Sequence, residues 1–217
     1  MTYYGRHPEK YSDEECYALA RKLIAKVQRS GRVKTEYYGI ENIPKGDEGY
    51  MLISNHQGKY DAVGIMAGHD RPCTVLMNKK RSKMPIANQF ISLLRGQRID
   101  SNSIRQQMTV MQEISREIGE GRVYLVFPEG GYDKGQKNWT REFKQGCFSC
   151  AVRAKCAIVP VVVVDSYIPF NTKSMKSVTT KVVYLPPVPY ESYAHMTSAE
   201  ICAHVKGLID EELKKYS

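Results

Sequence analysis

Short apolar runs alternate with amphipathic stretches along most of this 217-residue chain. The apolar runs are bounded by turn-forming residues and predict buried strands at 50–54, 73–78, 123–127, 158–164 and 181–185, with an edge strand at 33–38. The stretches with helical spacing predict helices at 61–68, 84–94, 103–118, 142–154 and 199–215. Because strands that alternate with helices are typical of α/β folds, we expect a single α/β domain with a largely parallel central sheet flanked by helices.

A further amphipathic helix is predicted ahead of this alternation. Its apolar residues recur at three- and four-residue steps between Ser12 and Ser30, and Gly31 follows as a stop signal. We therefore divide the chain into an N-terminal amphipathic helical segment, residues 1–31, and an α/β domain, residues 32–217. The apolar stripe is wide enough to face a protein core, which we favour. The basic residues beside it leave a helix on a membrane surface as the alternative.

The charge balance of the chain indicates an anionic partner. Lys and Arg number 32 against 23 Asp and Glu, which gives a net charge of +9. Membrane headgroups, a phosphorylated substrate and nucleic acid all fit this excess. No nucleic-acid motif accompanies the basic residues, so we do not expect a nucleic-acid partner. The longest apolar run, 156–164, falls far short of the ~20 residues that a membrane span needs, so we expect no transmembrane span.

Six cysteines in a chain without an apparent secretory leader are expected to be reduced. Cys147 and Cys150 have the spacing of a metal or redox pair, but they lie in a helical pattern without a second ligand pair. We interpret them as small buried side chains and expect no metal site.

A histidine and an aspartate follow the predicted strand 50–54. His56 falls just after the strand end, where parallel α/β folds build their sites. On one continuous helix His56 and Asp61 would be about 140° apart, but they meet if His56 lies in the loop and Asp61 in the first helical turn. The carboxylate then orients the imidazole and leaves its other nitrogen free as a base. A loop histidine and a helix-capping aspartate are the simpler alternative for the pair alone.

The segment from Val126 to Gly131 ends another predicted strand. Pro128 stops strand pairing and puts Glu129 at the strand mouth, and the glycines that follow allow a ligand to approach the backbone closely. A plain turn is the alternative. Basic clusters at 79–83 and 95–98 are interpreted either as a solvated rim or as a phosphate pocket.

Together and in this order, these segments resemble the glycerophospholipid acyltransferase family, of the 1-acyl-sn-glycerol-3-phosphate acyltransferase type. The family's N-H-x-x-x-x-D block, the HX4D motif, is matched by Asn55, His56 and Asp61. Its second block is matched in part at 96–100, its F-P-E-G block at 127–130, and its apolar strand around a proline at 158–161. The resemblance covers roughly residues 15–190.

The resemblance implies a reaction and a set of partners. A fatty acyl group would pass from acyl-CoA or acyl carrier protein to the free hydroxyl of 1-acyl-sn-glycerol-3-phosphate, giving phosphatidic acid in phospholipid synthesis. The thioesters are co-substrates, and no other cofactor is implied. The acceptor would be a lysophosphatidate-type lipid. The chain would bind peripherally to an anionic membrane surface on the cytoplasmic face.

The resemblance also implies roles for individual residues. His56 would act as the general base, and Asp61 would orient it and stabilise the imidazolium that forms. The residues implied in substrate binding are Asn55, Lys80, Arg98, Glu129, Gly130 and Lys134.

One departure from the family concerns the acceptor. The F-P-E-G block usually continues with Thr-Arg-Ser, whereas this chain continues with Gly131, Tyr132 and Asp133. The arginine expected to hold the acceptor phosphate is therefore absent from its usual place, and Lys134 or Arg98 would supply the charge. Two alternatives stay open: an acyltransferase acting on glycerol 3-phosphate, a lysophospholipid or an amino lipid, and a non-catalytic lipid-binding module on the same fold.

Overall fold

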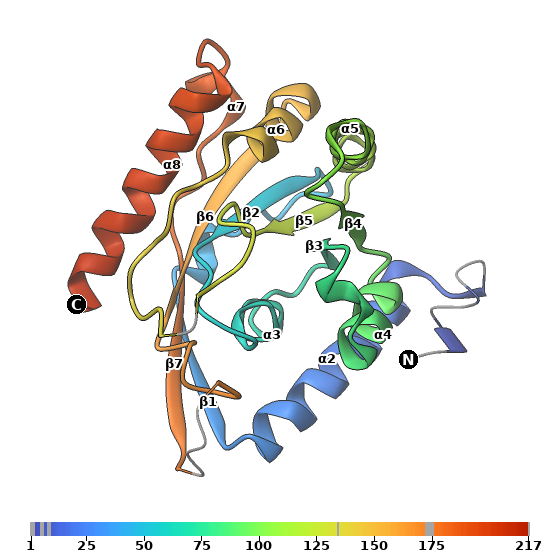
Figure 1. Ribbon diagram of the computed structural model, residues 1–217, viewed down its shortest axis with the longest axis vertical. Coiled ribbons are helices and arrows are strands. Elements are labelled where there is room, and N and C mark those ends of the chain that lie inside the picture. The colour runs from blue at the N-terminus through green and yellow to red at the C-terminus, as the bar shows by residue number, and fades with distance from the viewer. Residues whose placement is uncertain (1–2, 5–6, 8–9, 134, 172–175, 217) are drawn as a thin grey trace.

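A seven-stranded sheet forms the centre of the molecule in the computed structural model, which describes residues 3–4, 7, 10–133, 135–171 and 176–216 (Figure 1). The strands are β1 (Val33–Tyr38), β2 (Tyr50–Ser54), β3 (Cys73–Asn78), β4 (Gln97–Ile99), β5 (Val123–Val126), β6 (Ala157–Val164) and β7 (Val178–Tyr184). They lie in the order β1-β7-β6-β2-β5-β3-β4. Strands β2 to β6 are parallel, while β7 runs antiparallel to β6 and β1 parallel to β7. The predicted largely parallel sheet is confirmed.

Helices cover both faces of this sheet. They are α2 (Asp13–Ser30), α3 (Asp61–Ala67), α4 (Pro85–Leu93), α5 (Ile104–Gly119), α6 (Ser149–Ala154), α7 (Tyr190–Tyr193) and α8 (Ser198–Leu213). Side chains alternate across each strand, so Leu52 and Leu125 face α2, α3 and α4, while Met51 and Tyr124 face α5, α6 and α8. The strands read as continuous apolar runs because both faces are buried.

Helix α2 packs on the core. The Ser12 hydroxyl and the Glu15 carboxylate form a capping box at its start. Cys16, Tyr17, Ala20 and Ile24 on its apolar stripe are buried, and the Tyr17 hydroxyl donates to the backbone carbonyls of Met66 in α3 and of His69 just after it. The predicted packing of this helix against the protein core is therefore confirmed. The boundary between an N-terminal segment, residues 1–31, and an α/β domain, residues 32–217, stays a prediction.

Two elements differ from the sequence prediction. Strand β4 was not expected, since its three residues are too few to show a period and none is fully buried. The helix predicted at 142–154 is shorter, because α6 begins at Ser149 after a short 3-10 turn at Gln145–Phe148. The residues before that turn are held on the loop after β5, where the Lys144 amide donates to the Pro128 carbonyl at 3.0 Å.

All six cysteines are free and buried, and the burial predicted for Cys147 and Cys150 is confirmed. Burial raises the pKa of the Cys150 thiol to about 11. Among the helices in the described part of the chain, none is long and apolar enough to cross a bilayer.

Candidate active site

The site lies where the carboxyl ends of β5, β2 and β6 meet. These three strands are neighbours in the sheet and run parallel, so the loops that follow them emerge at one edge (Figure 1). The loop after β2 carries His56, the loop after β5 carries Glu129 and Gly130, and the loop after β6 carries Ser166. The fold thus gathers segments that are up to 110 positions apart in the sequence.

His56 and Asp61 form a hydrogen-bonded pair. His56 Nδ1 lies 2.7 Å from Asp61 Oδ2, with the histidine in the loop and the aspartate at the first residue of α3. Because an ionised carboxylate only accepts hydrogen bonds, Nδ1 carries the proton and Nε2 keeps its lone pair. The His56 side chain is 17% exposed, so the imidazole ring lies at the edge of the protein interior. The geometry expected from the sequence is present.

Asp61 is completely buried and is held by more than the histidine. Its Oδ2 atom also accepts the backbone N–H groups of Gln57 at 2.6 Å and Gly58 at 2.9 Å. Its Oδ1 atom accepts the Ser166 hydroxyl at 2.5 Å. These donors compensate the burial of the carboxylate and fix the plane in which it meets the imidazole. Ser166 was missed by sequence reasoning, although a polar residue just past a buried strand is the signal that identified His56.

Two aromatic rings confine the imidazole. Phe127 stacks on the His56 ring with centroids 4.3 Å apart, and Tyr132 meets it edge-on at 4.7 Å. Both come from the segment after β5 that contains the F-P-E-G block. This packing limits rotation of the imidazole to orientations that keep the bond to Asp61.

Glu129 holds the backbone around the histidine. Its Oε1 atom accepts the His56 N–H at 2.8 Å, and its Oε2 atom accepts the Gln136 side-chain amide at 2.9 Å and the Arg141 N–H at 3.2 Å. Burial raises the pKa of Glu129, and these hydrogen bonds act in the opposite direction. The carboxylate was predicted to contact substrate, but with 3% exposure and these donors it is a positioning group in this structure.

Asn55 is likewise occupied by the protein itself. Its side-chain amide donates to the Val163 carbonyl at 3.0 Å and its oxygen accepts the Val163 N–H at 2.9 Å. The side chain is fully buried between β2 and β6. We therefore infer that Asn55 joins the loop to β6, in place of the predicted contact with substrate.

Gln57 and Asn138 link the loop after β2 to two further segments. The Gln57 side chain donates to Asn138 Oδ1 and accepts the Ser166 N–H, each at 3.0 Å. Asn138 in turn donates to Asp165 Oδ1 at 3.0 Å. These residues also escaped sequence reasoning, since their partners come from distant parts of the chain.

The predicted cationic residues do not all reach the dyad. Arg98 in β4 donates to Asn88 Oδ1 and Ser92 Oγ of α4 at 3.1 and 2.8 Å. Lys80 is exposed after β3, and Lys134 lies outside the described residues. No contact of Arg98 or Lys80 with His56 or Asp61 is among those of the described chain.

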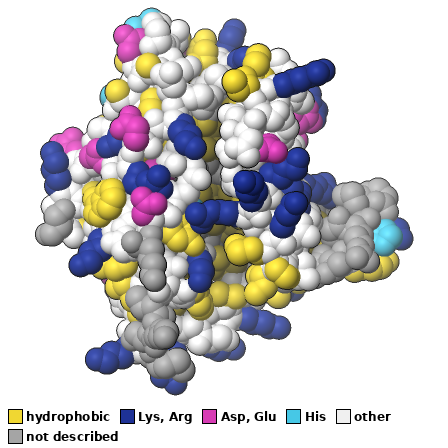
Figure 2. Space-filling view, viewed as in Figure 1, with side chains coloured by type: hydrophobic (Ala, Val, Ile, Leu, Met, Phe, Trp, Pro, Cys, Tyr) yellow, Lys and Arg dark blue, Asp and Glu magenta, His cyan; other side chains and the backbone are white. Residues whose placement is uncertain are grey.

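Other cations take the place beside the glycine loop. The Arg81 guanidinium lies over the Tyr132 ring, 5.0 Å from its centroid. Gly130 has φ 70°, and a Cβ there would lie 2.7 Å from Lys144 Nζ, so the lysine reaches across the loop. Figure 2 shows Lys and Arg side chains on both sides of a hollow that runs down the middle of this face of the molecule. Positive charge therefore gathers around the loop that follows β5.

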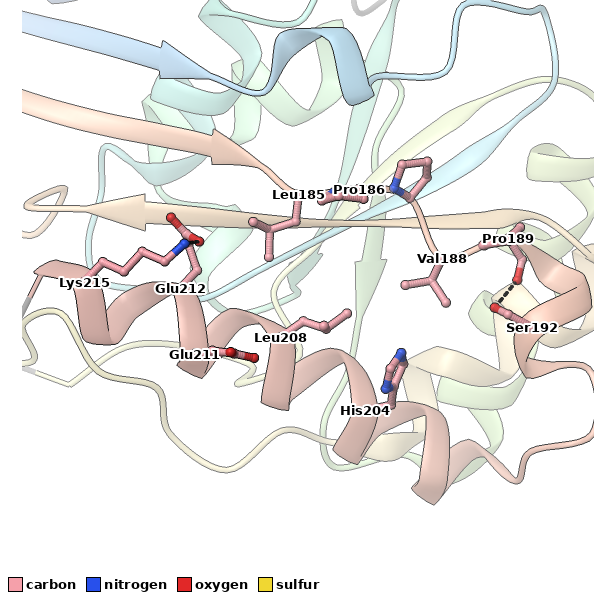
Figure 3. A pocket seen from close by; sticks show the side chains of 11 residues that line it. Leu185, Pro186, Val188, Pro189, Ser192, His204, Leu208, Glu211, Glu212 and Lys215 are labelled. Atoms are coloured by element: carbon pink, nitrogen blue, oxygen red, sulfur yellow. Dashed lines mark hydrogen bonds and ion pairs between the residues drawn. The ribbon is translucent and has the colours of Figure 1, made fainter.

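A surface groove and a second buried histidine lie away from the His56–Asp61 pair. A groove of about 410 Å³ runs between α8 and the segment Leu185 to Pro189 and is lined by His204 and Leu208 (Figure 3). The buried His69 contacts the Tyr50 hydroxyl at 2.7 Å, near the start of β2. Neither feature includes the His56–Asp61 pair.

Comparison with known proteins gives one consistent family. The sequence model for acyltransferases matches residues 34–164. A 1-acyl-sn-glycerol-3-phosphate acyltransferase of Salmonella typhimurium is 28% identical over 165 residues, which are 75% of this chain and 66% of the relative. A 1-acyl-sn-glycerol-3-phosphate acyltransferase alpha of Homo sapiens is 28% identical over 178 residues, 80% of this chain and 61% of the relative. The chain thus spans less than two thirds of the length of these relatives.

A solved structure shares the fold. The crystal structure of the 1-acyl-sn-glycerophosphate acyltransferase of Thermotoga maritima superposes with a TM-score of 0.69 at 20% sequence identity. The match covers 90% of this chain and 80% of that one, so the arrangement of sheet and helices is common to both.

Proposed function

This chain belongs to the acyltransferase family, and from that membership we propose that it transfers a fatty acyl group to the free hydroxyl of 1-acyl-sn-glycerol-3-phosphate. The product is phosphatidic acid, and the donor is an acyl thioester. The observation that carries the proposal is the 2.7 Å bond between His56 Nδ1 and Asp61 Oδ2 beside the loop that contains Glu129. The names of the relatives point to the same acceptor.

His56 is the general base of the proposed reaction. Its Nε2 atom removes the acceptor hydroxyl proton while the oxygen attacks the thioester carbonyl. The new C–O bond forms, the C–S bond breaks, and the imidazolium returns its proton to the departing thiolate. Asp61 holds the imidazole in the required tautomer and stabilises its positive form. Since the thioester is already activated, no acyl-enzyme is needed, and the buried cysteines take no part.

The acceptor phosphate is assigned to the cations beside the glycine loop. Arg81 and Lys144 flank Gly130 and Tyr132, beside the place where the family resemblance leads us to expect an arginine after the F-P-E-G block. A guanidinium pairs with a phosphate through two parallel hydrogen bonds, and a nearby ammonium adds charge. Arg98 and Lys80 remain predicted contributors at the rim.

Both types of acyl donor are anionic. Coenzyme A carries phosphates and acyl carrier protein is acidic, so each is attracted by a chain of net charge +9. We propose that the protein acts peripherally on an anionic membrane, at its cytoplasmic face, where the lysolipid acceptor resides.

The test is an acyl-transfer assay with purified protein. Acyl-CoA and acyl carrier protein thioesters are each supplied with lysophosphatidate, glycerol 3-phosphate, a zwitterionic lysophospholipid and an amino lipid. We expect the highest kcat/KM with lysophosphatidate and no transfer by His56→Ala. Preference for another acceptor would replace the substrate assignment, and absence of transfer to every acceptor would support the non-catalytic alternative.

A further inference from the structure

Large apolar side chains protrude from two helix starts near the proposed site. Ile86 in the first turn of α4 is 78% exposed, and Ile104 at the start of α5 is 77% exposed. Met84 and Met108 beside them are each 56% exposed. Apolar side chains of this size gain by leaving water, so their exposure at two successive helix starts indicates that this part of the surface meets a partner.

These side chains lie at the edge of the sheet that carries His56. Helix α4 follows β3 and α5 follows β4, and both strands run parallel to β2. The loops after β3 and β4 are joined to each other, since Asn78 Nδ2 donates to Ser101 Oγ at 3.4 Å and Lys79 Nζ lies 3.6 Å from Asp100 Oδ2. Because the carboxyl ends of these parallel strands meet at one edge of the sheet, the two helix starts and the loop after β2 lie at that same edge.

Positive charge accompanies the apolar side chains. The exposed basic residues on these two connections are Lys79, Lys80, Arg81, Lys83 and Arg105. The acidic Asp100 between them already pairs with Lys79. Apolar side chains ringed by Lys and Arg are the pattern with which peripheral proteins enter the headgroup layer of an anionic bilayer.

We propose that the α4–α5 surface, made of Met84, Ile86, Ile104 and Met108 with Lys83 and Arg105, docks the protein on an anionic lipid bilayer. Ile86 and Ile104 insert below the headgroups, and the basic residues bind lipid phosphates. This inference rests on the proposed function, because it brings the mouth of the His56 site against the layer in which a lysolipid acceptor lies.

The alternative membrane-binding surface, on α2, exposes fewer apolar side chains. The apolar stripe of that helix is used by the core through Cys16, Tyr17, Ala20 and Ile24, and Val27 at 39% exposure is its main protruding apolar residue. A folded protein partner is also less well matched. Lys83 and Arg105 lie within three positions of the protruding isoleucines, whereas charged residues are depleted from the centres of protein interfaces.

The experiment is co-flotation of the full chain with vesicles of phosphatidylcholine alone or mixed with phosphatidylglycerol. We expect binding to the anionic vesicles, weakened by salt. Ile86→Gln/Ile104→Gln should reduce the partition coefficient about tenfold or more, since it removes the inserted groups. Lys83→Gln/Arg105→Gln should reduce binding to anionic vesicles about tenfold and leave the weak binding to neutral vesicles unchanged.

Matched variants elsewhere on the molecule test whether the α4–α5 surface is the one that binds vesicles. Ile40→Gln changes an exposed isoleucine after β1, at the opposite flank of the sheet from β4, and should bind like the wild type. Arg153→Gln/Lys155→Gln removes the same charge from the segment before β6 and should also bind nearly as the wild type. Lys22→Gln/Lys26→Gln tests α2. Loss of binding in that variant with full binding by Ile86→Gln/Ile104→Gln would overturn the proposal.

Two further measurements separate this inference from the proposed reaction. Vesicle binding is measured without any thioester, so it stands even where no acyl transfer is found. The Ile86→Gln/Ile104→Gln variant should keep its turnover on a detergent-dispersed acceptor and lose it on vesicles. If that variant instead binds vesicles normally and shows a raised KM for an acyl carrier protein donor, the surface serves the acidic carrier protein and the bilayer assignment is wrong.

Discussion

The Ser166 hydroxyl donates to Asp61 Oδ1 at 2.5 Å, on the carboxylate oxygen opposite the one that contacts His56. Ser166 follows β6 and Asp61 begins α3, so the bond joins positions 105 residues apart. Asp61 is therefore clamped between the loop after β2 and the loop after β6. Its orientation toward the imidazole depends on both, which makes Ser166 a positioning residue for the proposed base.

Ser166→Ala should lower kcat about tenfold, because a hydrogen bond to a charged group contributes roughly 1.5–3 kcal/mol. The KM for the thioester should stay the same, since the hydroxyl faces Asp61 and is itself buried. Steady-state kinetics on the purified variant measures both. Ser192→Ala, which removes an exposed hydroxyl on α7, is the control. Unchanged kcat in Ser166→Ala would show that the clamp is dispensable.

His56→Ala should abolish acyl transfer, with kcat/KM falling by about 10³ or more, because no other base takes the hydroxyl proton. The thermal midpoint should change little, since the side chain lies partly exposed at the edge of the core. Radiolabelled acyl transfer and a thermal melt measure the two effects. His204→Ala, in an exposed position on α8, should behave as wild type. Transfer at a substantial fraction of the wild-type rate would remove His56 from the mechanism.

Arg81→Gln should raise the KM for a phosphomonoester acceptor about tenfold, because a charge-assisted pair with phosphate is lost. The KM for the thioester and the KM for an acceptor without the phosphomonoester should not change. A detergent-dispersed acceptor keeps this assay independent of vesicle binding. Arg153→Gln removes the same charge at a distance from the site and serves as the control. An equal rise in KM for both acceptors would argue against phosphate recognition by Arg81.

Asn55→Ala should destabilise the protein by about 2–4 kcal/mol. The substitution leaves the buried N–H and C=O groups of Val163 without their partners, and each such group costs about 1–3 kcal/mol. Urea unfolding of the variant and of Asn102→Ala, an exposed asparagine, measures the difference. A stable Asn55→Ala protein with a raised KM would instead favour the substrate contact expected from the sequence.

His69 makes the folded state sensitive to acid. Burial lowers the pKa of His69 to about 4, and the ring donates from Nδ1 to the Arg71 carbonyl and accepts the Tyr50 hydroxyl at Nε2. The unfolded chain takes up this proton below its ordinary pKa of about 6.5. The contribution to stability is therefore complete above about pH 6.5 and is lost as the pH falls toward 4, by up to about 3 kcal/mol.

His69→Gln should flatten this part of the pH dependence. Urea unfolding between pH 4 and 7 compares wild type with His69→Gln and with the exposed control His204→Gln. If the free energy of unfolding fell equally steeply with pH in the wild type and in His69→Gln, His69 would not be the cause of the acid sensitivity.

The order of strands and helices could be predicted because the local periodicity of apolar residues indicates each element. Strands such as β2 and β3 are continuous apolar runs between turn residues, and the structure gives them the predicted bounds. The short β4 and the late start of α6 could not be predicted in this way. Strand β4 forms only because β3 pairs with it, and α6 starts late because the preceding backbone bonds to the loop after β5.

The sequence by itself determined the fold class through local periodicity, and it identified His56 and Asp61 as a pair through the HX4D block and the order of the blocks that follow it. Tertiary structure alone decided that Glu129 and Asn55 hold backbone, that Ser166 clamps Asp61, and that Arg81 stands over Tyr132. Those contacts join residues roughly 50 to 110 positions apart, where local periodicity carries no information. They follow from strand order and register, which only the packed sheet sets.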